Sequence, residues 1–402
     1  MLLKTIKSVI PVVYWIFVPL ALIFLINGGK DAEIGFAIIN ILLFLISHRV
    51  SVILHECGHV LFTLIAGGQV KRMTLGSLHK VFQKKIGKMK LVLNSRLTSG
   101  FVNVYFEDLK NIRVKLILVF SGGIAVNSTL VLLAWYISGF PENIFGNIHP
   151  VLCFGAANLY TLFLSVIPFP IKFNGIRTSN DALAIIGFLF NKNKDFRSYL
   201  YLADIYNAND LIEEKKYDEA IALLRGIQKK SNGFRSSDIT ISYAMLKKGE
   251  FGPALEILEN LLPDVDKKYL KAYKYILYNN LAWNYLVMNR TAEAEKYSEL
   301  AYNGSKNSDF IRGTRAAALI ENGYYYMGKN IVLNYINFRF ANSQNLCASM
   351  YCSLAYAGMG DWPNSEKYLR FVVNNSESLD EDEKVLFERV KNKIELLKQN
   401  PK

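Results

Sequence analysis

The chain has 402 residues, of which 51% are hydrophobic, and its formal net charge at pH 7 is +13. This length is enough for two domains, and its four cysteines are too few and too scattered to predict a disulfide framework. The positive charge does not require a nucleic-acid partner, since loops that flank membrane helices are also rich in lysine and arginine. We therefore predict a membrane protein with no nucleic-acid partner.

Acidic residues divide the chain into two unlike halves. Of the 34 aspartates and glutamates, only seven precede Phe190, namely Asp31, Glu33, Glu56, Glu107, Asp108, Glu142 and Asp181. The others lie in a polar second half that is rich in lysine and tyrosine. We predict a membrane-embedded domain at residues 1–194 and a cytoplasmic helical domain at residues 195–402.

The first apolar stretch, Ser8–Ile26, follows two lysines, as the core of a signal sequence would. It contains Pro11 and Pro19, and no small-residue cleavage site precedes Asn27. A stretch of about 19 residues can span a bilayer as a helix. We therefore expect an uncleaved transmembrane helix here.

The second apolar stretch runs from Ile34 to about Ala66 and carries the motif His55-Glu56-Cys57-Gly58-His59. Histidines four residues apart lie one turn apart on the same helix face, a spacing that suits one tetrahedral zinc ion. The intervening Glu56 then reaches a metal-bound water and takes its proton. Charged groups at membrane depth are costly, so their presence there predicts a function, which this pattern identifies as metalloprotease chemistry.

This second stretch is too long for one straight crossing, since about 33 residues form roughly 50 Å of helix. A kink at Ser47-His48-Arg49 would divide it, whereas an unbroken helix would project into the cytoplasm. Both arrangements fit the sequence.

Residues 67–111 differ from the apolar stretches around them. The segments Lys88–Asn94 and Gly100–Phe106 carry β-forming residues that partly alternate, with turn residues between them. We predict a small β-hairpin made of these two segments. Its edge could hold an extended substrate by strand addition, or the hairpin could simply cover the end of the preceding helix.

The third apolar stretch, Ile112–Ser138, carries the run Ser121-Gly122-Gly123-Ile124-Ala125-Val126-Asn127. Small residues permit close helix packing inside a membrane. The amide of Asn127 could hydrogen-bond a group of the site or a substrate backbone. We predict Asn127 as a substrate-binding residue, with simple helix packing as the alternative.

The fourth apolar stretch, Pro150–Ile167, is followed by turn signals at Pro168-Phe169-Pro170 and Asn174-Gly175. Asp181 comes next, just before another apolar run. Zinc needs a third protein ligand and an open position for water, and a chain reversal here would bring Asp181 back to the histidines. Alternatively, Asp181 or one of the two residues before it only caps the next helix.

From Tyr199 onward the chain becomes helical and repetitive. Three segments occupy the same place in successive helix pairs: Tyr217–Ala220, Phe251–Ala254 and Thr291–Ala294. Two later units have predicted turns at Gly328 and Gly360. Small residues at fixed places let paired helices approach, and stacked pairs bury a continuous core. We predict a degenerate tetratricopeptide-like (TPR-like) array of about five units, with an irregular helical domain as the alternative.

Basic residues cluster between the second and third apolar stretches, at Lys71, Arg72, Lys80, Lys84, Lys85, Lys88, Lys90 and Arg96. Positive loops beside membrane helices usually stay in the cytoplasm and contact anionic headgroups of the lipid bilayer. With four spans, this places both termini in the cytoplasm and the histidine motif near the cytoplasmic end of its helix. We predict a multi-pass protein of the cell membrane.

These features resemble the site-2 proteases, a family of intramembrane zinc metalloproteases. The resemblance covers roughly residues 34–190 and depends on four matching pieces: His55-Glu56-Cys57-Gly58-His59, Ala66-Gly67-Gly68, Gly122-Gly123 with Asn127, and Pro168 with Ser179-Asn180-Asp181. It implies that His55, His59 and Asp181 ligate zinc. It also implies that Glu56 is the general base.

The chain departs from the family pattern in two places. The family often has glycine after the ligand aspartate, where this chain has Ala182, and it commonly has asparagine three residues before the first proline, where this chain has Ser165. A different alignment places Asn174 in the third-ligand position, and asparagine is a poor zinc ligand. We prefer Asp181.

The sequence thus predicts an all-α, multi-pass membrane domain with a small β-hairpin, followed by a TPR-like α-solenoid. The predicted activity is that of a Zn²⁺-dependent endopeptidase cleaving a membrane-spanning or membrane-bound peptide or protein. The repeats would recruit a protein partner or regulate access. One rival is a catalytically inactive membrane-anchored scaffold that acts through its repeats. The other is a transporter, which four spans without broken-helix repeats disfavour.

Overall fold

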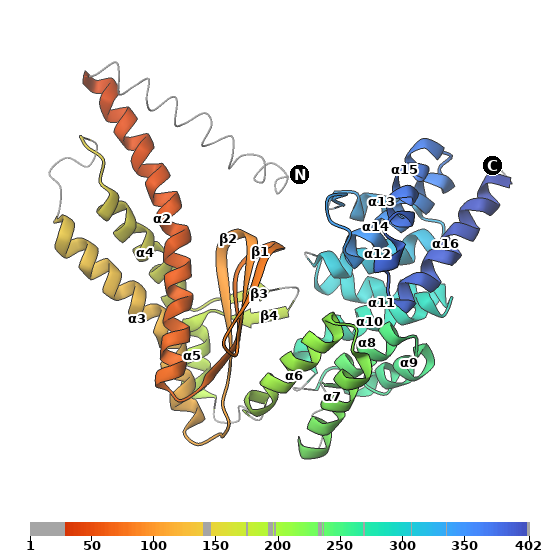
Figure 1. Ribbon diagram of the computed structural model, residues 1–402, viewed down its shortest axis with the longest axis horizontal. Coiled ribbons are helices and arrows are strands. Elements are labelled where there is room, and N and C mark those ends of the chain that lie inside the picture. The colour runs from red at the N-terminus through yellow and green to blue at the C-terminus, as the bar shows by residue number, and fades with distance from the viewer. Residues whose placement is uncertain are drawn as a thin grey trace. The chain divides into compact units, whose positions relative to one another are not determined.

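The computed structural model describes residues 29–139, 146–173, 176–191, 196, 198–231, 235, 237–267, 270–306, 308–334 and 336–399. The chain forms two compact units, the first made of Met1–Ile171 and Ser179–Ala203 and the second of Lys172–Thr178 and Asp204–Lys402. Figure 1 shows the helices and strands in chain order. The predicted first span, Ser8–Ile26, lies outside the described residues.

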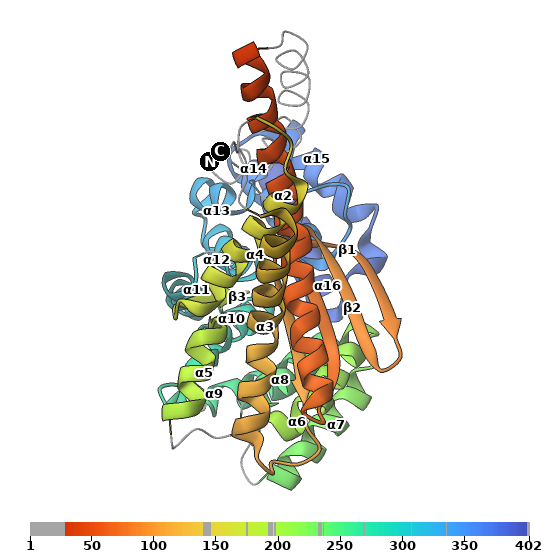
Figure 2. The same cartoon turned by 90° about the vertical axis from the view of Figure 1, so that its left-hand side faces the viewer.

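Three apolar helices pack against one another in the first unit: α2 (Gly29–Ile65), α3 (Ile112–Ser138) and α4 (Pro150–Val166). Figures 1 and 2 show them side by side. Among the described residues, Ala32–Ile65 and Ile112–Ser138 are long and apolar enough to cross a membrane, whereas α4 and α5 (Asp181–Phe190) are apolar but shorter. The three stretches predicted at these places are therefore helices.

The second apolar stretch forms one continuous helix rather than two. Helix α2 has 37 residues, so it is about 55 Å long at the usual rise per residue. Residues 36–57 contain neither proline nor glycine, so the sequence there offers no usual cause for a sharp kink.

The hairpin has different strands from those predicted. Strand β1 (Gln69–Ile86) pairs antiparallel with β2 (Met89–Tyr105), and the chain reverses at Gly87, whose φ is 57°. The two segments predicted to pair with each other are both parts of β2. Residues 72–75 of β1 pair antiparallel with residues 100–103 and in parallel register with residues 90–93. The two predicted segments therefore lie on opposite sides of this part of β1 and run in opposite directions, so β2 turns back between them although they do not pair with each other.

A compact core connects this hairpin to the helices. Phe106 at the end of β2, Leu116 of α3 and Phe188 of α5 are at most 1% exposed and belong to one buried cluster. A short second sheet, made of β3 (Pro170–Phe173) and β4 (Ile176–Ser179), directly precedes α5. Packing of Ala184 and Phe188 against residues of α3 fixes α5 relative to α3.

The second unit consists mainly of helices. Helix α6 (Ser198–Glu213) begins in the first unit and ends in the second. The helices that follow are α7 (Tyr217–Ser231), α8 (Ser237–Lys248), α9 (Phe251–Glu259), α10 (Lys274–Val287), α11 (Thr291–Gly304), α12 (Asp309–Glu321), α13 (Tyr325–Val332), α14 (Ser343–Gly358), α15 (Trp362–Val373) and α16 (Glu381–Gln399). Short 3-10 turns lie at Leu262–Asp264, Lys271–Tyr273 and Ser376–Ser378. The helices from α8 to α15 form four pairs, and each pair packs against the next. We call the first members, α8, α10, α12 and α14, the A helices.

Small residues occupy one fixed place in this array. Ala220, Ala254 and Ala294 are each the fourth residue of α7, α9 or α11, and none of the three has exposed surface. Gly328 holds the same place in α13, where a β-carbon would lie 2.5 Å from Ile320. Gly328 is therefore a packing residue, and the predicted turn is instead at Gly323, whose φ is 85°. The turn predicted at Gly360 is confirmed by a φ of 77°.

Candidate metal centre

Close packing of α2 against α3 surrounds the histidine motif. A β-carbon on Gly58 would lie 2.5 Å from the carbonyl oxygen of Gly122, and one on Gly122 would lie 2.5 Å from that of Gly58. Gly123 packs against the imidazole of His55, which a β-carbon there would approach to 2.4 Å. The small residues predicted to favour helix packing thus let α3 pass directly beside a histidine ring.

The start of α5 brings Asp181 to the two histidines. Asn180 is the N-cap of α5: its side chain accepts a hydrogen bond from the backbone of Leu183 and donates one to the carbonyl of Ile167, with 2.6 Å between Nδ2 and that oxygen. Capping therefore belongs to Asn180, and the Asp181 carboxylate points to α2 instead. Its oxygens lie 2.9 Å from Nε2 of His55 and 3.5 Å from Nε2 of His59.

The outward nitrogen of each imidazole has its own partner. Nδ1 of His59 lies 2.8 Å from the carbonyl oxygen of Val119, and Nδ1 of His55 lies 2.6 Å from Oδ1 of Asn127. A carbonyl oxygen can only accept, so Nδ1 of His59 carries the proton. In the neutral ring, Nε2 then presents its lone pair to the centre.

A buried chain of hydrogen bonds fixes the same tautomer for His55. The amide of Asn158 donates to the carbonyl of Phe154, so its Oδ1 accepts from Nδ2 of Asn127 at 2.8 Å. Oδ1 of Asn127 consequently faces His55 as an acceptor. Ser51 completes the network with bonds to both amides, and Asn127, Asn158 and Ser51 are all fully buried. Partners of this kind orient metal-binding histidines.

Three acceptor groups thus converge on one point. The Nε2 atoms of His55 and His59 are 3.1 Å apart, and the ligand atoms of these two residues and Asp181 all lie within 4.8 Å of one another. Two imidazole lone pairs and a carboxylate repel one another unless a cation or protons lie between them. Nitrogen and carboxylate ligands with outward-turned protons fit Zn²⁺.

Glu56 is buried beside this cluster, with 6% of its surface exposed. Strand β2 covers it at Gly100, where a β-carbon would lie 2.5 Å from Oε1 of the carboxylate. Only glycine fits this contact without displacing the carboxylate. The hairpin therefore approaches the motif at the residue predicted to be the general base.

The remaining candidates have ordinary surroundings. Cys57 is exposed, on a different side of α2 from the buried histidines. The ring of His48 packs edge-on against Tyr160 of α4, with centroids 5.2 Å apart. Asn174, the alternative third ligand, lies outside the described residues. The ammonium of Lys247 pairs with a second group of acidic residues, which lies at the start of α16 and just before it: Asp380, Asp382 and Glu383.

The residues that orient His55 through Asn127, namely Asn158 and Ser51, were not predicted from the sequence. Asn158 and Ser51 are polar residues inside long apolar stretches, and that isolation is a signal of function in a membrane helix. Their pairing with Asn127 depends on how three helices pack, which no motif records. Asn127 was predicted to bind substrate, and its side chain is occupied by His55, Asn158 and Ser51.

Fold and site together define a mainly helical protein with a histidine–aspartate cluster of the kind that metallopeptidases use. A family model, peptidase family M50, matches residues 43–393. The chain belongs to this family, the site-2 protease family of metallopeptidases. The match includes the histidine motif, Asp181 and most of the helical repeats.

Other comparisons yield less. No curated protein matches the chain. Two solved structures are similar to it, one of the nearly identical TPR-like repeats of a putative kinesin light chain from Podosopora anserina and one of the same repeats with a single substitution. Each has 16% identity and a TM-score of 0.34, and each alignment covers 44% of this chain and 94% of the other.

Proposed function

We propose that this protein is an intramembrane zinc endopeptidase, with His55, His59 and Asp181 as the zinc ligands and Glu56 as the general base. One observation carries the proposal. Two imidazoles, each with its outer nitrogen bonded to an acceptor, turn their Nε2 atoms toward the carboxylate of Asp181. Membership of the M50 family supports a metallopeptidase activity for this arrangement.

The chemistry divides among few residues. A bound zinc ion supplies Lewis-acid polarisation of the scissile carbonyl and acidification of water. Glu56 takes a proton from the attacking water and delivers it to the leaving amine. Asn127 holds His55 through Nδ1, which makes it a positioning residue, and direct contact of Asn127 with substrate stays a prediction.

The apolar helices support a membrane location for this reaction. We place α2 and α3 across the bilayer with the predicted span Ser8–Ile26 and with α4, in a multi-pass arrangement with both termini in the cytoplasm. The substrate is then a membrane-spanning or membrane-bound segment, unwound locally and held against the β1–β2 hairpin. The contact of Gly100 with Glu56 brings that hairpin to the catalytic carboxylate.

We assign residues 1–194 to the protease domain and residues 195–402 to a cytoplasmic domain that recruits a partner or regulates access. A solenoid of paired helices presents an extended surface suited to that task. The pairs α8/α9 to α14/α15 supply such a surface.

Cleavage of β-casein by the detergent-purified full chain tests the activity without knowledge of the natural substrate. The Glu56→Gln variant should retain its zinc and lose at least roughly 100-fold in rate, because general-base catalysis contributes on that order. Cys57→Ser, a change at the exposed neighbour of Glu56, is the matched control and should cleave normally. Undiminished cleavage by Glu56→Gln would exclude the proposed mechanism.

A further inference from the structure

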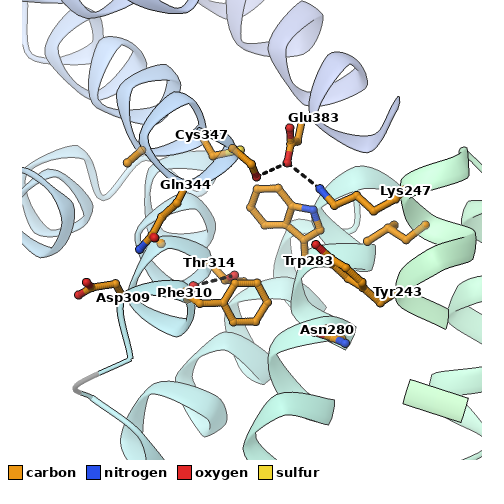
Figure 3. A pocket seen from close by; sticks show the side chains of 14 residues that line it. Tyr243, Lys247, Asn280, Trp283, Asp309, Phe310, Thr314, Gln344, Cys347 and Glu383 are labelled. Carbon is orange, nitrogen blue, oxygen red and sulfur yellow. Dashed lines mark hydrogen bonds and ion pairs between the residues drawn. The ribbon is translucent and has the colours of Figure 1, made fainter. Parts of the chain in front are cut away.

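The helical-repeat unit contains a pocket of about 140 Å³. Its walls come from all four A helices and from the start of α16, as Figure 3 shows. All of its lining residues lie between 243 and 383, within the second unit. It is far in sequence from the metal centre and plays no part in the proposed hydrolysis.

Aromatic rings line this pocket from three successive A helices. Tyr243 comes from α8, Trp283 from α10 and Phe310 from α12 (Figure 3). Phe310 is 49% exposed, so part of its ring is available to a ligand. The faces of aromatic rings attract cations, and tryptophan does so most strongly.

The charged groups in and next to the pocket lining leave negative charge in excess. Lys247 and Glu383 line the pocket, whereas Asp380, Asp382 and Lys215 do not. The ammonium of Lys247 lies 2.6 Å from Glu383, 3.1 Å from Asp382 and 3.4 Å from Asp380. Lys215 supplies a second cation, 3.0 Å from Asp380. Two lysines therefore face three carboxylates. Burial raises the pKa of Asp382 to about 6, although Lys247 lowers it, and Glu383 adds to the rise.

One buried amide in the pocket has no hydrogen-bond partner among the residues that the structure describes. It is the side chain of Asn280 of α10, which is 6% exposed and lines the pocket. An asparagine amide offers donors and an acceptor, which together match a peptide group. Gln344 of α14 carries a second amide at the exposed rim.

We propose that this pocket binds a lysine or arginine side chain of an extended segment in a partner protein. The ammonium of Lys247 already lies 5.7 Å from the centroid of the Tyr243 ring, so the cationic head of the partner lies against the rings of Trp283 and Phe310. There it balances the excess carboxylate, and the amide of Asn280 bonds the peptide backbone next to it. Helices stacked in this way form an elongated surface, which suits a polypeptide better than a small free cation. The proposal depends on the partner-recruiting role proposed above for the repeats.

Binding can be measured apart from catalysis by using the full-length Glu56→Gln variant in detergent. The probes are fluorescent heptapeptide mixtures with randomised flanks and a fixed central residue: arginine, lysine, norleucine or glutamate. We expect the arginine and lysine mixtures to bind at least tenfold more tightly than norleucine and glutamate. Equal binding of norleucine would overturn the proposal, as would the absence of binding by all four mixtures.

Matched variants locate the binding. Phe310→Ala removes the exposed ring of the pocket and should weaken the arginine mixture at least fivefold. Tyr326→Ala removes an aromatic residue that is 67% exposed on α13, outside the pocket, and should leave binding unchanged. Equal effects of the two changes would overturn the assignment. Free arginine amide that competes as strongly as the peptides would overturn it too, in favour of a small-cation site.

These results are independent of the protease proposal. Peptide binding is measured without any cleavage and is tested by changes in the second unit, whereas zinc content and casein cleavage are tested by changes in the first, so either proposal can fail while the other stands.

Discussion

At the scale of single residues, the proposed metal centre depends on the neighbours of His55 and His59 as much as on the two histidines themselves. The carbonyl of Val119 and the amide of Asn127 decide which nitrogen of each histidine faces the centre. Gly123 leaves the space that the His55 ring occupies. Groups of the protein itself therefore turn the Nε2 atoms of both histidines toward Asp181.

Substitution of Gly123 by alanine tests this orientation. The added methyl group would lie 2.4 Å from the His55 ring, so the ring must turn away from Asp181. We expect zinc affinity to fall roughly 10- to 100-fold, as for other losses of ligand orientation. Isothermal titration with Zn²⁺ measures the change.

Gly226→Ala is the control for that measurement, because Gly226 lies in helix α7 with no atom within 4 Å of an added β-carbon. Its zinc affinity should equal that of the wild type. Unchanged affinity in Gly123→Ala would contradict the orienting role of this contact.

Residue types alone predicted which residues form the histidine–aspartate cluster, but not the residues that hold them in place. His55, Glu56 and His59 are recognisable by their spacing and by their cost in an apolar stretch. Asp181 is recognisable because acidic residues are so rare before it. The chain of bonds from Asn158 through Asn127 to His55 joins three helices, and such contacts depend on packing rather than on local sequence.

At the scale of elements, α16 closes the repeat unit. Its first turn bonds to α8 through Lys247 and to α10 through Trp283, whose indole donates to Asp382 at 2.7 Å. Farther along, Arg389 donates to the carbonyl of Val287 and Lys393 pairs with Glu321 of α12. Helix α16 thus contacts residues that precede its own by more than 70 positions in the sequence.

This closure predicts a pH dependence of stability. The pKa of Asp382 rises from its usual 3.8 to about 6 in the folded chain, so the folded state holds the proton more tightly. The unfolding free energy should therefore fall as pH rises from about 4 to 7, by on the order of 2 to 3 kcal/mol from this group. The Asp382→Asn variant has no titratable group at this position, so its unfolding free energy should fall by about 2 to 3 kcal/mol less over the same pH range.

Hydrogen exchange of the α8 and α16 amides in the full chain, compared at the two ends of this range, measures the difference. Asp218→Asn is the control, since Asp218 is 78% exposed in its pair with Lys248, and it should follow the wild type. If Asp382→Asn also follows the wild type, the burial of Asp382 does not control this dependence.

Elements differed in how far the sequence predicted them. Apolar length sufficed for α3, whose bounds agree with the prediction, and repeated alanines marked the helix pairs. The partner of β2 was missed because β1 is rich in lysine and does not alternate clearly. The docking of α16 on α8 joins residues 135 positions apart, a separation that no sequence periodicity covers.

At the scale of the whole molecule, the chain forms two compact units. The first contains the histidine–aspartate cluster among apolar helices, and the second contains stacked helix pairs with a pocket of its own. A family match over residues 43–393 covers both. The proposed activity depends on the metal centre and fails without it.

The zinc content of the detergent-purified full chain tests that claim most directly. We predict about one zinc per chain in the wild type and in Cys57→Ser, and none in His55→Ala or Asp181→Ala, because either change removes a ligand. Zinc retained by Asp181→Ala would remove Asp181 from the ligand set. No zinc in the wild type, even after reconstitution with Zn²⁺, would contradict the proposed metal centre.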